Sequence, residues 1–145
     1  MFKNKNVLIS GGSSGIGLAL AKQLFSLGSS VTIIARRKDI LDKAKSEIEK
    51  ERIDSNQTVK TISADVSKYS DLKSALEKER PVADILINSA GIAYPGKFTE
   101  LEPEVFYTTT RYPTCICITI INIIPINRTG IPTIVNLFIL RISQI

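Results

Sequence analysis

The fold of this chain is decided by one short stretch, Ser10-Gly11-Gly12-Ser13-Ser14-Gly15-Ile16-Gly17. It follows the apolar residues 7–9 and precedes apolar residues at helical spacing up to Leu27. A strand that ends in a glycine-rich turn and continues into a helix presents unpaired N–H groups, and the positive end of the helix dipole, to an anion. Glycine has no Cβ, so it allows both the tight turn and the close approach of a diphosphate. The Gly-x-x-x-Gly-x-Gly spacing therefore predicts a dinucleotide site; the alternative is a tight turn that binds nothing.

Outward from this turn, strand-like and helical patterns alternate along the chain. Continuous apolar runs predict strands, and apolar residues at helical spacing predict helices. The predicted strands cover residues 6–10, 31–35, 59–63 and 82–88, and the predicted helices cover residues 16–27, 38–51 and 70–78, with a loop over 90–96. Because the connections are short and crossovers are right-handed, the pattern predicts an α/β fold. It is the N-terminal half of a Rossmann-type parallel sheet with strand order 3-2-1-4.

Composition narrows the class of ligand. The 145 residues suit about one domain. The net charge of +5 and the pI of about 9.3 are compatible with an anionic ligand or a membrane surface. The sequence contains no run rich in Lys and Arg, and no run of interleaved aromatic residues, that would indicate nucleic-acid binding. Cys115 and Cys117 form a lone C-x-C in a chain without histidine, which predicts neither a metal site nor a disulfide framework. The first residues lead directly into a strand and do not resemble a signal peptide.

The C-terminal part differs in composition from the rest. Residues 108–145 contain no Asp, Glu, Lys or Ala, and isoleucine and threonine dominate. We expect residues 1–106 to form the nucleotide-binding unit and residues 107–145 to form an irregular, non-homologous segment, which resembles translation in a wrong frame or through an intron. Its apolar runs are shorter than the ~20 residues of a membrane helix, and the alternative is a genuine segment that touches lipid. The strand over 82–88 would then be a bare edge, and the chain alone only marginally stable.

The end of the second strand gives the first indication of cofactor specificity. An acidic residue at this position bonds the ribose 2′-OH in NAD binders. Here the strand is followed by Arg36 and Arg37, which can instead pair with a 2′-phosphate. This pair also argues against a methyltransferase that binds S-adenosylmethionine. The alternative is a solvated basic pair at a helix start.

Two more polar sites follow strands three and four. The carboxylate of Asp65, beside Val66, can accept from an adenine amino group; the alternative is a cap for the next helix. In Asn88-Ser89-Ala90-Gly91 the small residues let a cofactor pass close to the backbone, and the Asn side chain can tie adjacent strands; the alternative is a plain turn. All these positions lie at carboxyl ends of strands, where open α/β sheets bind ligands.

These motifs resemble the short-chain dehydrogenase/reductase family. The signatures are Gly11-x-x-x-Gly15-x-Gly17, Asp65 and Asn88-Ser89-Ala90-Gly91. Within that family the chain is similar to 3-ketodihydrosphingosine reductases over roughly residues 6–106. The stretches that carry this similarity lie within residues 11–15, 35–48, 64–67, 90–92 and 96–102.

The resemblance implies NADPH-dependent reduction of 3-ketosphinganine to sphinganine, a lipid substrate, at the cytosolic face of the endoplasmic reticulum membrane. It allows membrane association and leaves oligomeric state and substrate chain length open. The predicted cofactor-binding residues are Gly11, Ser13, Ser14, Gly15, Ile16, Gly17, Arg36, Arg37, Asp65, Val66, Asn88, Ala90 and Gly91.

The sequence departs from the family at the catalytic residues. Such enzymes use a Ser, a Tyr and a Lys four residues after the Tyr, helped by an Asn, and all follow the fourth strand. After Gly91 no Tyr-x-x-x-Lys occurs, since Tyr107 is followed by Arg111 and Tyr112 by Ile116. The pair at Tyr69 and Lys73 is rejected because it precedes the fourth strand. We therefore predict no catalytic residue and a chain truncated before the catalytic set; the alternatives are a non-catalytic dinucleotide-binding module or a non-functional truncated product.

Overall fold

The computed structural model of the chain describes residues 2–91, 103–104, 116–120 and 138–142. Every predicted strand and helix is present. Most ends agree within one residue, but the second helix is shorter at its end and the fourth strand starts three residues later than expected. The elements are β1 (Asn6–Ser10), α1 (Gly15–Ser26), β2 (Ser30–Ala35), α2 (Lys38–Glu49), β3 (Val59–Ser63), α3 (Tyr69–Glu79), β4 (Ile85–Asn88), β5 (Ile116–Ile120) and β6 (Phe138–Ile142). Within these ranges, no helix is long and apolar enough to cross a membrane.

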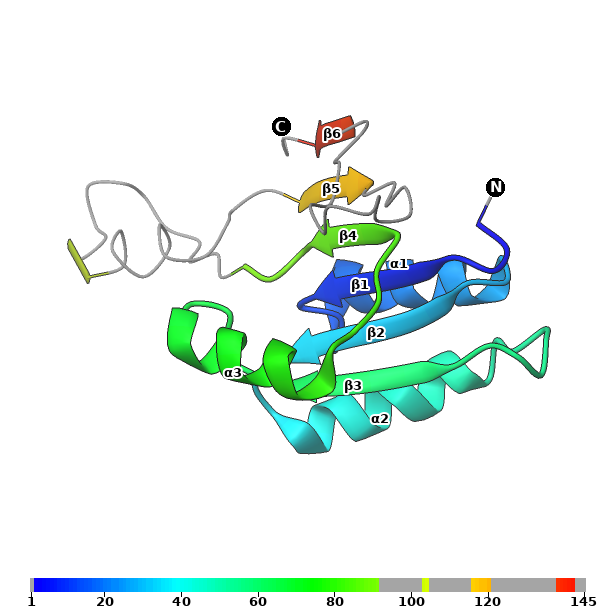
Figure 1. Ribbon diagram of the computed structural model, residues 1–145, viewed down its shortest axis with the longest axis horizontal. Helices are drawn as coiled ribbons and strands as arrows, with labels where there is room; N and C mark the ends of the chain where they lie inside the picture. Colours follow the sequence, from blue (N-terminus) through cyan, green and yellow to red (C-terminus); the bar gives the residue numbers. More distant parts are fainter. Residues whose placement is uncertain (1, 92–102, 105–115, 121–137, 143–145) are drawn as a thin grey trace, which may run out of the picture.

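One sheet organises the molecule. Its strand order is β3-β2-β1-β4-β5-β6 (Figure 1). The pairs β1–β2, β2–β3 and β1–β4 are parallel, so the predicted order 3-2-1-4 is confirmed. Because β1 lies between β2 and β4, Val7 is in register with both Val31 and Ile85. The carboxyl ends of the four parallel strands therefore meet at a single edge of the sheet.

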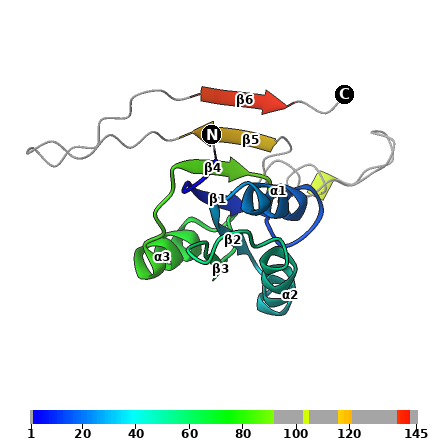
Figure 2. The same ribbon diagram turned by 90° about the vertical axis from the view of Figure 1, so that its right-hand side faces the viewer.

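The C-terminal part contradicts two expectations. We expected residues 107–145 to be irregular, yet β5 and β6 form antiparallel strands within them (Figure 2). We also expected β4 to be a bare edge, yet it pairs with β5, with Asn88 opposite Cys117. The physical reason is that β-branched residues favour strands, and an open apolar strand edge is a template for pairing. The predicted loop beyond Gly91, together with Tyr107, Arg111 and Tyr112, lies outside the described residues.

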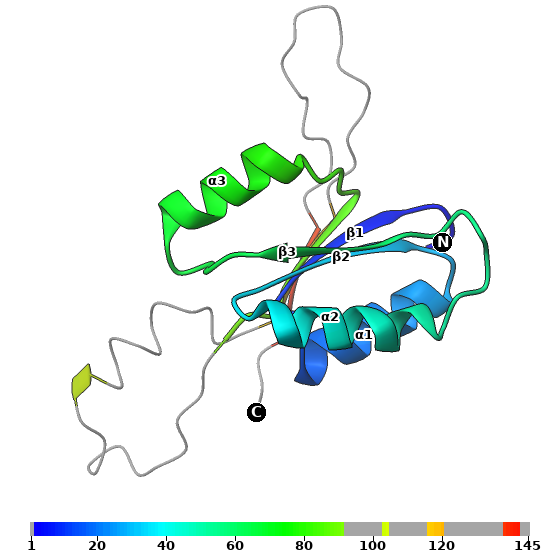
Figure 3. The ribbon, with the colours of Figure 1, turned by 90° about the horizontal axis from the view of Figure 1, so that it is seen from below.

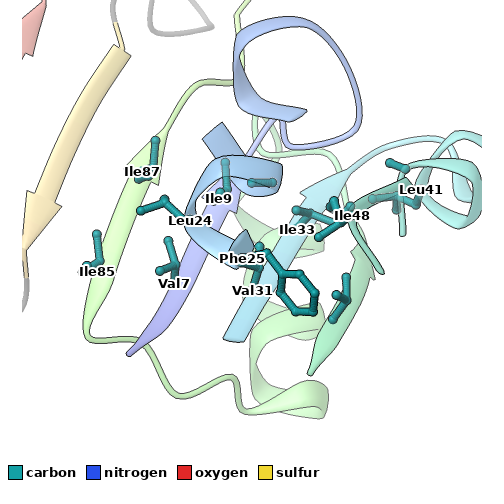
Figure 4. Close-up of a cluster of buried hydrophobic side chains, with 13 residues drawn as sticks. Val7, Ile9, Leu24, Phe25, Val31, Ile33, Leu41, Ile48, Ile85 and Ile87 are labelled. Carbon is teal, nitrogen blue, oxygen red and sulfur yellow. The ribbon is translucent and has the colours of Figure 1, made fainter. Parts of the chain in front are cut away.

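Helices cover the two faces of the parallel part. Seen from below, α1 and α2 lie on one face and α3 lies on the other (Figure 3). The alternation along β1 explains this: Val7 and Ile9 belong to the core under α1 and α2, whereas Leu8 belongs to the core under α3. The first core includes Phe25 of α1 and Ile48 of α2, both fully buried (Figure 4). The sheet is thus a rigid support for the residues at its carboxyl edge.

A buried glutamine closes the opposite, amino-terminal end of the first core. Gln57 is only 4% exposed. Its side-chain nitrogen donates to the carbonyl oxygens of Phe25 and Ser29, the latter at 3.0 Å. Its side-chain oxygen accepts from the backbone N–H groups of Ile53 and Asp54, at 3.0 and 2.8 Å. A single side chain therefore joins the end of α1 to the loop that leads into β3.

We expect Gln57→Ala to lower the free energy of unfolding by about 1–3 kcal/mol, because it removes four side-chain hydrogen bonds to backbone groups, two of them buried. Urea unfolding followed by circular dichroism measures the change. Asn56→Ala is the matched control, since this neighbouring side chain is exposed, and it should stay within about 0.5 kcal/mol of the unmutated chain. Equal losses in both variants would show that the glutamine bonds are not the cause.

Candidate functional site

Nearby backbone atoms leave no room for a Cβ at two positions of the glycine turn, and the Ile33 side chain leaves none at a third, Gly12. Gly11 has a φ of +72°, and a Cβ there would lie 2.7 Å from the Cα and N atoms of Ala90. A Cβ on Gly17 would overlap the carbonyl oxygen of Gly11. These two glycines are therefore needed to bring β1, α1 and the chain after β4 together, with or without a ligand.

Gly15 is different. Its φ is +54°, but a Cβ built there meets no atom within 4 Å. It begins α1, whose N-cap Ser14 makes no side-chain cap hydrogen bond and whose first turn carries no acidic residue. The first turns of α2 and α3 carry Asp39 and Asp71 instead. The start of α1 thus presents backbone N–H groups and a positive dipole end toward open space, which fits a diphosphate.

The ends of β1 and β4 are tied to each other beside this turn. The Ser10 hydroxyl donates to the Asn88 side-chain oxygen at 3.5 Å and accepts from the Ala90 N–H at 3.4 Å. The Ser89 N–H donates to the Ser10 carbonyl at 3.1 Å. The expected link between adjacent strands through Asn88 is present. The structure thereby brings Ser89 and Ala90 against Gly11.

The basic pair lies at the same edge. Arg36 and Arg37 are exposed and directly follow β2, and Arg37 is the N-cap of α2. The Gly11 N–H donates to the carbonyl of Ile34 at 2.8 Å, so the glycine turn begins beside the end of β2. The Ser63 hydroxyl donates to the Arg36 carbonyl at 3.0 Å and fixes the backbone there. Positive charge therefore lies one strand away from the start of α1.

Asp65 is held in a turn of its own after β3. One oxygen of its carboxylate accepts from the Ser67 N–H at 3.0 Å and from the Ser67 hydroxyl at 2.7 Å. The Asp65 N–H donates to the Asp71 carboxylate at 2.6 Å. The residue that caps α3 is Lys68, so the alternative in which Asp65 caps this helix is wrong. Val66, next to it, packs against the core under α3.

The charge state of Asp65 follows from these contacts. The side-chain and backbone hydrogen bonds from Ser67 hold the pKa of the Asp65 carboxyl below its ordinary value. Burial opposes them to a smaller extent, and the cations of Arg36 and Lys68 add still smaller lowering effects. A lowered pKa keeps the carboxylate ionised at neutral pH and further into acid than for an ordinary aspartate. Asp65 is therefore a hydrogen-bond acceptor at physiological pH.

Tyr69 is the first residue of α3, and Lys73 follows one turn later. Tyr69 is 78% exposed, and the Lys73 ammonium is 3.9 Å from the Glu77 carboxylate one turn further along the helix. With Leu72, Leu76 and Glu77 they line an open hollow of about 320 Å³ on the surface of α3. The pair is therefore built into a surface turn of the helix.

Three hydroxyl or carboxylate groups at this edge were not identified from sequence: Ser10, Ser67 and Asp71. Ser67 had a usable signal, because an aspartate followed two residues later by serine commonly closes such a side-chain-to-backbone turn. Ser10 binds Asn88 and Ala90, which are distant in the sequence, and Asp71 binds the backbone N–H of Asp65, six residues earlier. Local sequence indicates neither contact.

Comparison with known proteins decides the family. Residues 5–130 match the short chain dehydrogenase family. The chain belongs to this family. The match extends beyond residue 106, where we had expected the resemblance to end, and it includes β5. The glycine turn and the polar residues at the carboxyl edge are thus features of a member of the short chain dehydrogenase family.

Particular relatives give a finer comparison. The chain is 45% identical over 106 residues to a 3-ketodihydrosphingosine reductase of Bos taurus, which covers 70% of this chain and 32% of the relative. The chain therefore spans about a third of the length of that relative.

Two solved structures are similar in fold. The L-sorbose reductase of Gluconobacter frateurii, in complex with NADPH and L-sorbose, has a TM-score of 0.60 and 30% identity, covering 70% of this chain and 39% of that one. The 3-ketoacyl-(acyl-carrier-protein) reductase of Brucella melitensis, in complex with NADH, has a TM-score of 0.62 and 31% identity, covering 77% and 45%. The two neighbours thus carry different cofactors, NADPH and NADH.

Alanine substitutions at Gly15 and Gly17 should lower the free energy of unfolding by different amounts. Gly15→Ala should cost about 1–2 kcal/mol, the strain of a left-handed backbone with a Cβ, and should leave the fold intact. Gly17→Ala should cost more, about 3 kcal/mol or above, because its Cβ would overlap backbone that cannot move aside. Urea unfolding of both variants tests this. Similar losses would mean that the Gly15 position is as crowded as Gly17.

Proposed function

We propose that these residues form the NADPH-binding part of a reductase that converts 3-ketosphinganine to sphinganine. The observation that carries the nucleotide part is the carboxyl edge of the sheet, where the open start of α1, Arg36 and Asp65 follow three neighbouring strands. The support for the lipid substrate is the similarity to the bovine 3-ketodihydrosphingosine reductase. We further propose that this reductase acts at the cytosolic face of the endoplasmic reticulum membrane, as the resemblance to 3-ketodihydrosphingosine reductases implies.

Each part of the site has a role in holding the dinucleotide. The N–H groups at residues 13–17 bind the diphosphate, with the positive end of α1 behind them. Arg36, with Arg37 beside it, pairs with the 2′-phosphate, and Asp65 accepts from the adenine amino group. Asn88, Ala90 and Gly91 line the nicotinamide side. When bound, the dinucleotide supplies the hydride for carbonyl reduction.

The choice of NADPH over NADH rests on Arg36 and Arg37. Both are exposed at the end of β2, where an NAD-binding protein places a carboxylate for the ribose 2′-OH. A guanidinium forms bidentate, charge-assisted hydrogen bonds with a phosphate. The 2′-phosphate, which NADH lacks, is therefore the group that distinguishes the two cofactors at this position.

A second candidate is a dinucleotide-binding module that performs no chemistry. It is favoured by one observation on the sequence: after Gly91 these 145 residues contain no Tyr-x-x-x-Lys. The single such pair, Tyr69 and Lys73, lies on α3 with its lysine paired to Glu77. The two candidates share the cofactor site and differ only in turnover.

The unmutated chain should bind NADPH about tenfold to a hundredfold more tightly than NADH, since a charge-assisted hydrogen bond contributes roughly 1.5–3 kcal/mol. Arg36→Asp should abolish or reverse this preference, because its carboxylate repels the 2′-phosphate and can accept from a ribose hydroxyl. Calorimetric titration with both cofactors measures the ratio.

Arg80→Asp is the matched control for that titration. It makes the same change in net charge at the end of α3, and it should keep the ratio of the two affinities. Equal affinity for NADPH and NADH in the unmutated chain would contradict the assignment of Arg36. An equal fall in the ratio for both variants would attribute the preference to net charge.

A polypeptide of these 145 residues should not reduce 3-ketosphinganine with NADPH at a measurable rate. The ketone oxygen needs a positioned proton donor, and its loss alone costs about 10²–10⁴ in rate. Following NADPH absorbance with the lipid present tests this, with Tyr69→Phe as the companion variant. Turnover that disappears in Tyr69→Phe would make Tyr69 the donor and overturn its assignment to a surface turn.

A further inference from the structure

The turn after β3 contains more fixed polar contacts than a connection between a strand and a helix requires. Its serine, Ser67, gives both of its donors to a single oxygen of the Asp65 carboxylate. Its backbone is held from the other side by Asp71, which accepts from the Asp65 N–H. An aspartate side chain has two rotatable bonds, and two donors on one oxygen fix both of them. The carboxylate is therefore set in one orientation before any ligand arrives.

The neighbourhood explains why this orientation matters. Arg36 at the end of β2 is close enough to lower the pKa of the Asp65 carboxyl, so the two charges attract each other. The two hydrogen bonds from Ser67 fix the direction of one carboxylate oxygen beside this cation. The carboxylate therefore keeps one orientation as an acceptor.

We propose that Ser67 is a positioning residue that orients the Asp65 carboxylate to recognise the adenine amino group. The inference rests on the proposed function, because it assumes that a dinucleotide occupies this edge. Ser67 acts through Asp65 and has no contact of its own with the ligand. Its hydroxyl thereby decides how strongly the site distinguishes adenine from a purine that lacks the amino group.

The test compares two ligands in each variant. One is NADPH, and the other is its reduced hypoxanthine analogue, in which an oxygen replaces the adenine amino group. The unmutated chain should prefer NADPH by about tenfold, the effect of one hydrogen bond to a charged acceptor. Ser67→Ala should reduce this preference to below about threefold, and Ser67→Thr, which keeps the hydroxyl, should restore it.

The ratio of the two affinities within a variant is the readout that a merely structural role would not move. A lower folded fraction weakens both ligands alike and therefore cancels in the ratio. Ser26→Ala is the matched control, because its hydroxyl bonds the Gln23 carbonyl in the last turn of α1, far from the carboxyl edge. If Ser67→Ala folds poorly, Ser67→Cys keeps the size of the side chain with a weaker donor and should change the ratio in the same direction.

A double-mutant comparison closes the test. In an Asp65→Ala background the preference for adenine should be absent, and adding Ser67→Ala should change the ratio no further. An unchanged ratio in Ser67→Ala, with NADPH still bound, would overturn the role of Ser67 and leave the proposed function standing. Absence of NADPH binding by the unmutated chain would overturn both.

Discussion

The close approach of Gly11 to the backbone of Ala90 is the contact on which the rest of the structure depends. With a Cβ at Gly11 only 2.7 Å from that backbone, the turn after β1 and the chain after β4 would have to separate. The register of β1 against β4, and the hydroxyl contacts of Ser10, follow from this proximity. One packing constraint thus aligns the central strands and also shapes the floor of the proposed nucleotide site. A substitution at Gly11 would therefore disturb the strand alignment and the proposed site together.

At the carboxyl edge of the sheet, the positions of individual charged side chains matter more than the net charge. Helix α1 begins without an acidic residue, whereas α2 and α3 begin with one each. Asp65 remains ionised because hydrogen bonds stabilise its charge, and Arg36 adds to that stabilisation from the next strand. An acceptor and a cation therefore occur as neighbours without neutralising the start of α1. This separation is what a ligand with an amino group and several phosphates requires.

Much of this was available from the sequence, and the reasons for the failures are specific. Gly11, Gly15 and Gly17 predicted the turn, and the apolar runs predicted four parallel strands in the right order, because both signals are local. The strands β5 and β6 were missed because an isoleucine-rich run shows no period and pairs only where another strand offers its edge. Asp65 stayed ambiguous until the bonds from Ser67 were known, since they depend on backbone geometry. The assignment of individual residues to the cofactor remains a prediction.

The buried Gln57 has a consequence for the dynamics of the opposite end. The N–H groups of Ile53 and Asp54 belong to a surface loop, yet both donate to an oxygen inside the core. These bonds slow the exchange of both hydrogens with solvent, and their acceptor belongs to a side chain that also binds Phe25 and Ser29, about thirty residues earlier in the chain. Isotope exchange at these two amides of an otherwise exposed loop therefore reports how firmly the loop is held to this end of the first core.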